Sequence, residues 1–333
     1  MSLATKHRPT TFEDVCGQSN NVAILKYMIE NNSVPSAMGF FGASGCGKTT
    51  LARICANLIN EGKGHPIEQD AASNNSVDDV RQIIESAKQR SLDSEYKIFI
   101  IDEAHAITSQ GWQAFLKLLE EPNKFTKFIF CTTNPEKIPD TVISRLQTFT
   151  FSKISDDLIV DRLKHISDIE GFNVSDESLS YITRVSNGSM RQSITNLEKC
   201  AARGSDISYE TVIETVGTAD FHIFASLYLS IYNNDVKQAI KTVENVYSSG
   251  KDIKTFIFEF LKFMLDLNKA NIFDGDLSLT TLPNISEISD LFKYHTKFKW
   301  MLENLVSFYE NNKQNSDIRF MLESKLIDWC TQV

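Results

Sequence analysis

The nine residues 42–50, GASGCGKTT, carry the residue types needed to hold phosphate groups. Glycines at fixed offsets let backbone N–H groups turn toward phosphate oxygens without a Cβ in the way. A following helix would add its positive dipole end. Lys48 would reach the β- and γ-phosphates, and the Thr49 hydroxyl would face Mg²⁺. The alternative is a glycine-rich turn with an exposed lysine. We predict a phosphate-binding P-loop whose contacting residues are Gly42, Ser44, Gly45, Cys46, Gly47, Lys48, Thr49 and Thr50.

An acidic pair, Asp102 and Glu103, ends the apolar run of residues 96–101, YKIFII. Beside a P-loop, Asp102 would hold the Mg²⁺ ion. Glu103 would orient and deprotonate the attacking water as a general base. The alternative is a solvated acidic pair at a strand end, which would be favoured if the P-loop were absent.

Three further polar residues could act on a γ-phosphate. Thr133 ends the next apolar run, and parallel strands place such residues at one sheet edge. Arg145 could supply charge to the phosphoryl transition state, although a lone arginine is usually a surface charge. Arg191 opens a helix, where its charge opposes the helix dipole and calls for an anion. The alternative for Thr133 is a strand-end cap.

The elements that must position these residues alternate between strand and helix. Apolar runs at 38–41, 96–101 and 125–132 predict buried strands, and residues 51–58, 77–87 and 110–121 predict helices. This alternation predicts an α/β domain with a parallel sheet. After residue 151 only helices are predicted, at 157–169, 176–185, 190–202 and 208–215, with serine caps at 155, 175, 189 and 208. We expect three domains: residues 1–152 (nucleotide-binding), 153–217 (helical lid) and 218–333 (helical collar).

Beyond residue 219 the chain has helical periodicity throughout. Phe256, Phe260, Phe263, Met264 and Leu267 form a wide apolar stripe. The stripe predicts the core of a helical bundle, or else a surface buried against neighbouring subunits.

Composition limits the class of protein. The 333 residues carry a net charge of −9, so nucleic acid would be bound by a local surface or within an assembly. No apolar run approaches the roughly 20 residues of a membrane span, and the N-terminus lacks a signal peptide's apolar core. The six cysteines include no CxxC pair, which favours reduced thiols in a cytosol and no zinc site. We therefore expect a cytoplasmic protein.

The order of the motifs resembles that of the AAA+ clamp-loader ATPases, in particular the γ/τ-type subunits of bacterial DNA polymerase III. The resemblance covers about the first 200 residues and rests on KHRPTTFEDVCGQ (6–18), GASGCGKT (42–49), QDAASNNSVDDVRQI (69–83), FIIDEAHAIT (99–108), FLKLLEEP (115–122), CTTNPEKIPDTVISR (131–145) and NGSMRQS (187–193). The last third matches only in helical character.

The resemblance implies roles for single residues. Arg8, Pro9 and Val15 would line an adenine pocket that Met190 closes. Thr133 and Arg191 would be the two sensors of the nucleotide. Arg145 would be an arginine finger that enters the ATP site of the neighbouring subunit, although the cysteine that follows it in the family is Leu146 here.

The resemblance also implies partners. These are a sliding clamp, primer–template DNA, and copies of this chain with other loader subunits in a ring or spiral. DNA would be contacted by Asn74, Ser76 and Arg81, and the clamp by Ile107 and Trp112, unless Trp112 packs into its own core. The family's four-cysteine zinc module is absent after the P-loop helix, so ATP and Mg²⁺ are expected without zinc.

Two other functions share the P-loop. One is a Holliday-junction-type DNA motor, against which the end of the chain shows no winged-helix pattern. The other is a non-hydrolysing scaffold subunit of a loader. Lys48, Thr49, Asp102 and Glu103 are all present, which speaks against a degenerate site.

Overall fold

The computed structural model describes residues 2–74, 76–216, 221–274, 277, 280–282, 291, 297–315 and 317–331. The chain divides into two compact units, residues 1–179 with 186–198 and residues 180–185 with 199–333. The predicted boundary at 217/218 lies outside the described residues, so the division into three domains stays a prediction.

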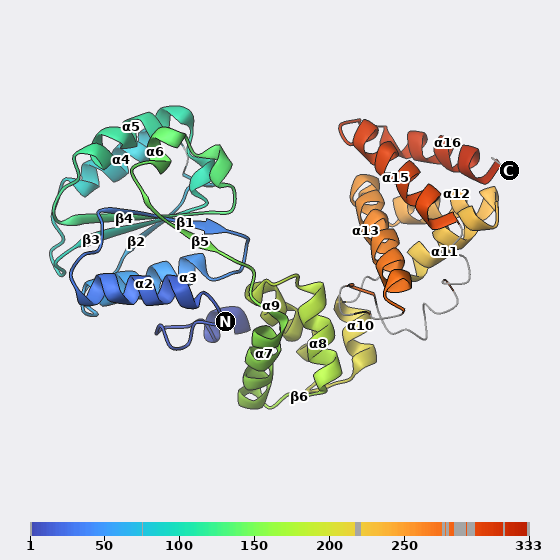
Figure 1. The fold of residues 1–333 in the computed structure, drawn as a ribbon, viewed down its shortest axis with the longest axis horizontal. Coiled ribbons are helices and arrows are strands. Elements are labelled where there is room, and N and C mark those ends of the chain that lie inside the picture. Colours follow the sequence, from blue (N-terminus) through green and yellow to red (C-terminus); the bar gives the residue numbers. More distant parts are fainter. Residues whose placement is uncertain are drawn as a thin grey trace. The chain divides into compact units, whose positions relative to one another are not determined.

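The first unit contains a five-stranded parallel sheet in the order β2-β3-β4-β1-β5 (Figure 1). The predicted α/β class is thereby confirmed. The edge strand β5 was not indicated by the sequence, because QTFTF alternates polar and apolar residues and only two of its five side chains are buried. The strands are β1 (Ala37–Gly42), β2 (Ile67–Asp70), β3 (Lys97–Asp102), β4 (Thr126–Thr132) and β5 (Gln147–Phe151).

Helices cover both faces of this sheet (Figure 1). Phe99 and Phe128 pack on one face with α4 (Val77–Ala87), α5 (Ser109–Glu120) and α6 (Asp140–Ile143). Ile98 and Ile129 pack on the other face with α2 (Ser19–Glu30) and α3 (Lys48–Ile59). Successive residues of a strand point to opposite faces, so a strand buried on both sides needs an unbroken apolar run. This is why the runs at 96–101 and 125–132 predicted buried strands correctly.

Three short elements complete this part of the chain. α1 (Leu3–Lys6) precedes α2, whereas η1 (Ala104–Ala106) joins β3 to α5 and η2 (Pro135–Lys137) joins β4 to α6.

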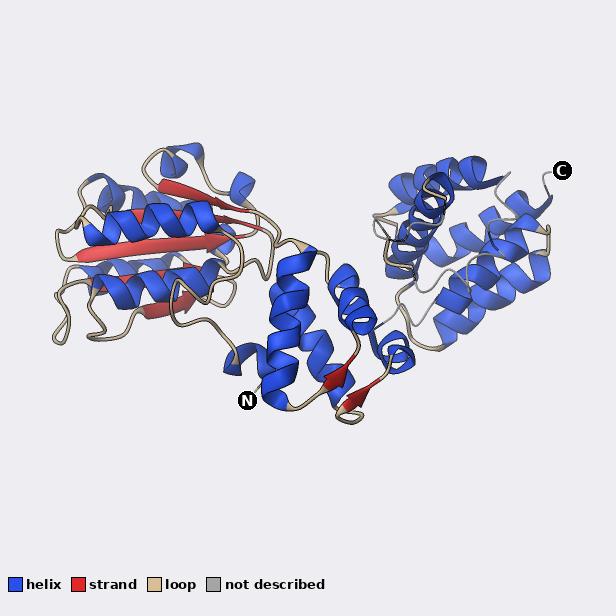
Figure 2. Ribbon diagram, turned by 60° about the horizontal axis from the view of Figure 1, so that its bottom comes forward, coloured by secondary structure: helices blue, strands red, loops and turns tan. Residues whose placement is uncertain are grey.

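Helices follow the sheet, as predicted. They are α7 (Asp156–Glu170), α8 (Asp176–Val185), α9 (Met190–Ala201) and α10 (Tyr209–Val216). Two strands of two residues each, β6 (Asn173–Val174) and β7 (Asp206–Ile207), were not expected (Figure 2). Ser175, Ser189 and Ser208 accept hydrogen bonds from backbone N–H groups at the starts of their helices. Ser155 occupies the N-cap position of α7, as predicted, but its side chain makes no capping hydrogen bond.

The remaining described helices are α11 (Phe221–Tyr232), α12 (Val236–Ser248), α13 (Ile253–Ile272), α15 (Phe298–Asn312) and α16 (Ile318–Thr331). The apolar stripe of α13 lies in one cluster with buried residues of the other four helices. Phe224 of α11 contacts the rings of Phe256, Phe260 and Phe263. The stripe is therefore the core of a bundle, the first of its two interpretations. None of the helices in the described part of the chain combines the length and apolarity that crossing a bilayer requires.

Candidate active site

The P-loop connects β1 to α3, as its sequence predicts. Gly45 has a φ of +74°, and a Cβ built there would lie 2.0 Å from the Ser189 Oγ. Gly47 has a φ of +104° immediately before α3 begins at Lys48. Both positions require glycine, Gly47 for its backbone conformation and Gly45 also for space. The loop is thus shaped by its glycines and lies directly against the turn that precedes α9.

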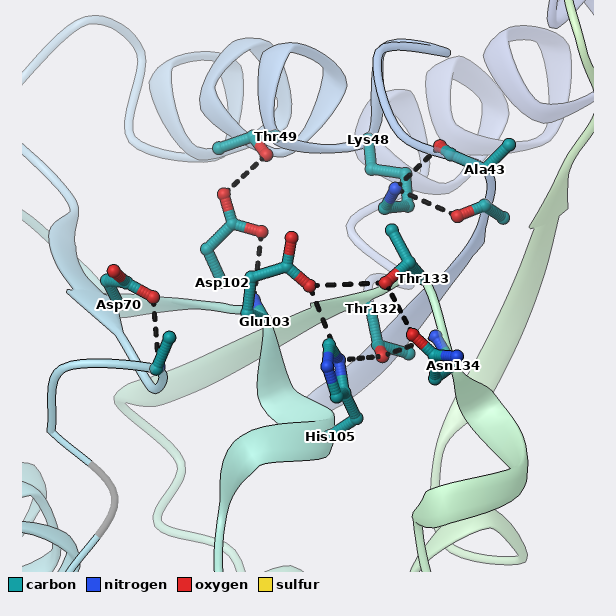
Figure 3. Close-up of polar contacts among 12 residues, drawn as sticks. Ala43, Lys48, Thr49, Asp70, Asp102, Glu103, His105, Thr132, Thr133 and Asn134 are labelled. Atoms are coloured by element: carbon teal, nitrogen blue, oxygen red, sulfur yellow. Dashed lines mark hydrogen bonds and ion pairs between the residues drawn. The ribbon is translucent and has the colours of Figure 1, made fainter. Parts of the chain in front are cut away.

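Lys48 and Thr49 point toward the strand ends (Figure 3). The Lys48 ammonium donates hydrogen bonds to the carbonyl oxygens of Gly42 (2.9 Å) and Ala43 (2.8 Å). The Thr49 hydroxyl donates to the Asp102 Oδ2 atom at 2.8 Å. The two residues expected to hold Mg²⁺ therefore face each other, although they lie on α3 and β3.

Glu103 has a left-handed backbone, with a φ of +48°. Such a conformation is costly for a residue with a Cβ and persists where the surroundings enforce it, commonly at functional sites. Its N–H donates to Asp102 Oδ1 at 3.0 Å. Its carboxylate Oε2 lies 3.3 Å from both the Thr133 hydroxyl and the His105 Nδ1 atom (Figure 3). The strand end thus fixes the direction of the proposed general base.

His105 was not singled out by sequence reasoning. Its Nδ1 also lies 3.0 Å from the hydroxyl of the fully buried Thr132. The Thr133 hydroxyl lies 2.8 Å from the Asn134 Oδ1 atom. Residues at the ends of β3 and β4 thus form one hydrogen-bonded group, as expected for neighbouring parallel strands.

A cavity of about 390 Å³ lies in front of this edge. Its wall combines residues that are distant in sequence: the N-terminal segment, the P-loop, the ends of β2 and β3, and the lid helices. The predicted residues among its lining are Arg8, Pro9, Val15, Ser44, Gly45, Cys46, Gly47, Lys48, Thr49, Thr50, Asp102, Glu103, Met190 and Arg191. Gly42, Thr133 and Arg145 do not line it.

Several lining residues were missed by sequence reasoning. His7 and Arg162 lie on the N-terminal and lid sides, and the Arg162 Nη2 donates to the His7 carbonyl oxygen at 3.0 Å. Arg53 of α3 and Glu68 of β2 form an ion pair of 2.5 Å at the same cavity. Only His7 had a sequence signal, its place beside Arg8 and Pro9.

The end of β2 ties the following loop to the acidic strand end. Asp70 pairs in register with Asp102, and the Ala71 N–H donates to the Asp102 carbonyl oxygen at 2.9 Å. The Asp70 Oδ1 accepts from the Ala72 N–H at 3.0 Å (Figure 3). The segment that leads to α4 therefore begins at the candidate metal site.

The three residues expected at DNA lie at the start of α4. Ser76 and Asp79 form a capping box, in which each side chain accepts from the other residue's backbone N–H. The Asn74 side chain donates to the Asp70 carbonyl oxygen at 3.1 Å, and the exposed Arg81 pairs with Asp78 at 3.0 Å. Ser76 and Arg81 are exposed and Asn74 is half-buried, and all three side chains already have intramolecular partners.

Arg145 lies outside the cavity, on the segment after α6. Its Nη2 is 2.6 Å from the Glu120 Oε1 atom at the end of α5, and its Nη1 donates to the Thr141 carbonyl oxygen. The Arg145 side chain is one-third exposed. It therefore serves no phosphate in this chain's own cavity, and it remains accessible to a neighbouring molecule.

Ile107 and Trp112 were expected to contact a clamp, and the structure argues against this role. Their exposed fractions are 6% and 1%. The Trp112 ring packs against Phe115 and Phe130 at centroid distances of 5.8 and 5.3 Å. A side chain enclosed in the core has no surface to offer a partner. The alternative, that Trp112 packs into its own core, is the one observed.

The donor set fits a nucleoside triphosphate with Mg²⁺. An ammonium and glycine-shaped loop amides suit phosphates, and the hydroxyl–carboxylate pair suits the cation. Burial raises the pKa of the Cys46 thiol, which keeps this loop side chain neutral beside phosphate charge. Among the described residues, no group of three or more His, Cys, Asp or Glu side chains could hold a metal ion. The absence of zinc stays a prediction.

The fold and the site together define a class. A P-loop after the first strand, an acidic pair ending β3, a polar residue ending β4 and an arginine on a following helical module characterise a P-loop nucleotide-binding domain of the AAA+ class. The Holliday junction branch migration motor RuvB of Thermotoga maritima has this fold. It matches with a TM-score of 0.54 at 18% identity, over 67% of this chain and 79% of that one.

Sequence relatives identify the branch of that class. The DNA polymerase III subunit gamma/tau of Mycoplasma genitalium is 31% identical over 285 residues, 79% of this chain and 48% of the relative. The tau subunit of Bacillus subtilis is 30% identical over 90% of this chain and 55% of the relative. The gamma subunit of Buchnera aphidicola is 29% identical over 88% of this chain and 87% of its own length. Residues 63–155 match the family model "DNA polymerase III, delta subunit".

The chain is therefore a homologue of the gamma and tau subunits of bacterial DNA polymerase III, as its motifs indicated. It spans about half the length of the first two relatives named above.

Proposed function

We propose that this chain is an ATP-hydrolysing subunit of a sliding-clamp loader, which opens the clamp and places it on primer–template DNA during replication. One observation carries the proposal: Lys48, Thr49, Asp102 and Glu103 converge on one cavity in a homologue of gamma and tau subunits. We place the protein in the cytoplasm of a bacterial or virus-infected bacterial cell.

The residues divide the chemistry between them. Lys48 and the loop amides hold the β- and γ-phosphates, and Thr49 with Asp102 holds Mg²⁺, which would neutralise charge on those phosphates. Glu103, directed by Thr133 and His105, accepts the proton of the attacking water. Arg191, which lines the cavity from α9, would contact the γ-phosphate.

The base of the nucleotide lies against the N-terminal segment. Arg8, Pro9 and Val15 line the adenine side of the cavity, and Met190 closes it from the lid. Since these residues come from opposite ends of the first unit's sequence, nucleotide binding fixes the lid relative to the sheet.

Arg145 acts on the ATP of a neighbouring subunit. Its position outside the chain's own cavity and its exposure support this role. Hydrolysis then depends on an assembly of this chain with copies of itself and other loader subunits. The lid and collar domains would hold that assembly together.

DNA contact is proposed at the start of α4. Backbone N–H groups there, with Asn74, Ser76 and Arg81, face phosphates of the primer–template duplex. The clamp must be contacted by a surface other than Ile107 and Trp112, because both side chains are buried.

The decisive assay measures ATP turnover of the purified chain alone, with its clamp and loader partners, and with primed DNA. A loader subunit is weakly active alone and is stimulated by both additions. A Holliday-junction motor would instead migrate junctions without a clamp; the likeness to RuvB at 18% identity supports only the shared fold. A scaffold subunit would show no turnover in the full complex, which would refute the proposal.

A further inference from the structure

The N-terminal segment that walls the cavity is held by the lid. Lys6 and His7 both contact the Glu170 carboxylate, at 2.7 and 2.5 Å. The Leu3 N–H donates to the Glu198 Oε1 atom at 3.1 Å, and Arg162 donates to the His7 carbonyl oxygen at 3.0 Å. Within the described parts of the chain, all long-range hydrogen bonds and ion pairs of residues 3–7 end on α7 and α9.

The site of Glu170 is unusual for an acid. It is the last residue of α7, where the negative end of the helix dipole disfavours a carboxylate. The charge of Glu170 therefore does not stabilise α7, whereas it provides a negatively charged partner for both Lys6 and His7. The side chains of His7 and Glu170 are only 9% and 14% exposed, so solvent screens this contact less than an ordinary surface pair.

The contacts of Glu170 with Lys6 and His7 lie next to residues that line the cavity. His7, Arg8 and Pro9 line the cavity directly after Lys6, and Arg162 lines it from α7. Glu170 itself does not line it. A residue that fixes this segment to α7 therefore sets the width of the cavity on its adenine side without touching the nucleotide.

We propose that Glu170 is a positioning residue, which clasps the N-terminal segment to lid helix α7 and so keeps the cavity closed around the base of an adenine nucleotide. The clasp comprises Lys6, His7, Arg162 and Glu170. This inference rests on the proposed function only in the identity of the ligand.

The first test needs no nucleotide. Hydrogen exchange of the backbone amides of residues 3–8 is compared in the full-length chain and in Glu170→Gln. Glu177→Gln is the matched control, because Glu177 is an exposed acid of α8 in the same compact unit. The clasp predicts at least severalfold faster exchange in Glu170→Gln and unchanged exchange in the control. Equal exchange in all three proteins overturns the proposal.

The second test measures affinity for Mg·ADP by titration calorimetry. An affinity gained through a closed state falls with the population of that state, and we expect about a three- to tenfold rise in Kd for Glu170→Gln. Lys6→Gln should show the same direction from the other, exposed side of the contact, where folding is not at risk. The charge reversal Lys6→Glu with Glu170→Lys re-forms the ion pair with residue 6 but gives His7 a cation in place of its anion, so Kd should be lower than in either single charge variant without returning to the wild-type value.

The outcomes separate the two ideas. A chain that binds no adenine nucleotide refutes the proposed function, while the exchange experiment still decides the clasp. If Kd is the same in Glu170→Gln and wild type, or if the reversed pair is as weak as the single variants, Glu170 has no positioning role. A parallel loss of thermal stability without rescue would mark it as merely structural.

Discussion

Arg145→Ala separates the proposed finger from an ordinary surface residue. In the isolated chain, the change removes the 2.6 Å contact with Glu120 and the hydrogen bond to the Thr141 carbonyl oxygen. The two side chains of that pair are one-third and one-half exposed. Exposed pairs of this kind contribute about 0.2–1 kcal/mol, so the stability of the chain should fall by no more than about 1 kcal/mol. Because Arg145 does not line the cavity, Mg·ATP affinity of the isolated chain should be unchanged.

The effect on catalysis should be far larger. An arginine finger supplies about 10³- to 10⁵-fold in turnover, or roughly 4–7 kcal/mol of transition-state stabilisation. We therefore expect the turnover stimulated by clamp and primed DNA to fall at least about 10³-fold in the assembled complex. Arg203→Ala is the matched control, since Arg203 also forms an exposed pair, with Glu214 at 2.7 Å. The assay is steady-state phosphate release from complexes whose assembly is checked by size.

Two results would refute this reasoning. Stimulation retained within about tenfold would remove Arg145 from the finger role. A variant that no longer assembles, or that binds Mg·ATP poorly when isolated, would show that Arg145 acts through structure rather than through the neighbour's phosphate.

Three further predictions concern other residues of the same unit. Glu103→Gln keeps the side chain's size but removes its charge, so turnover should fall about 10²- to 10⁴-fold while Mg·ATP still binds; unchanged turnover would exclude Glu103 as the base. Trp112→Ala empties a core position and should cost about 3–5 kcal/mol in urea unfolding; lost clamp binding at full stability would instead restore its role as an anchor. Lys6 and then His7 lower the pKa of the Glu170 carboxyl. Its stabilising charge is therefore present above the unfolded pKa of about 4.3 and is lost as pH falls through the lower folded pKa. Protection of residues 3–8 from exchange, corrected for intrinsic rates, should persist to about pH 5 and disappear in stronger acid, and protection lost near neutral pH would contradict this origin.

Sequence reasoning predicted the features that are encoded in contiguous residues. The P-loop and the acidic pair each occupy one short segment, and the two-sided burial of β3 and β4 leaves unbroken apolar runs. The edge strand β5 was missed because one-sided exposure leaves only a weak alternating pattern. The small strands β6 and β7, of two residues each, leave almost no periodicity to detect.

The features of the site that the sequence did not predict were missed for a different reason. The contacts of Glu170 with Lys6 and His7 join residues more than 160 positions apart, and no local pattern reports them. Trp112 stands near the start of an amphipathic helix, and the sequence does not say which flank of the apolar face is covered by the sheet. The structure resolves this, because α5 packs that flank onto Phe130 of β4.

Gly45 and Ser189 lie so close together that the tip of the P-loop limits how near the lid turn can come to it. The lid turn already rests on it, with the Ser189 Oγ where a Cβ at position 45 would lie. A side chain at position 45 would clash with Ser189 and push the lid turn away from the loop. Only a smaller residue at position 189 would give back that space. Position 45 is therefore restricted to glycine twice, by its left-handed backbone and by the contact with Ser189, and a change at position 189 relieves only the second restriction.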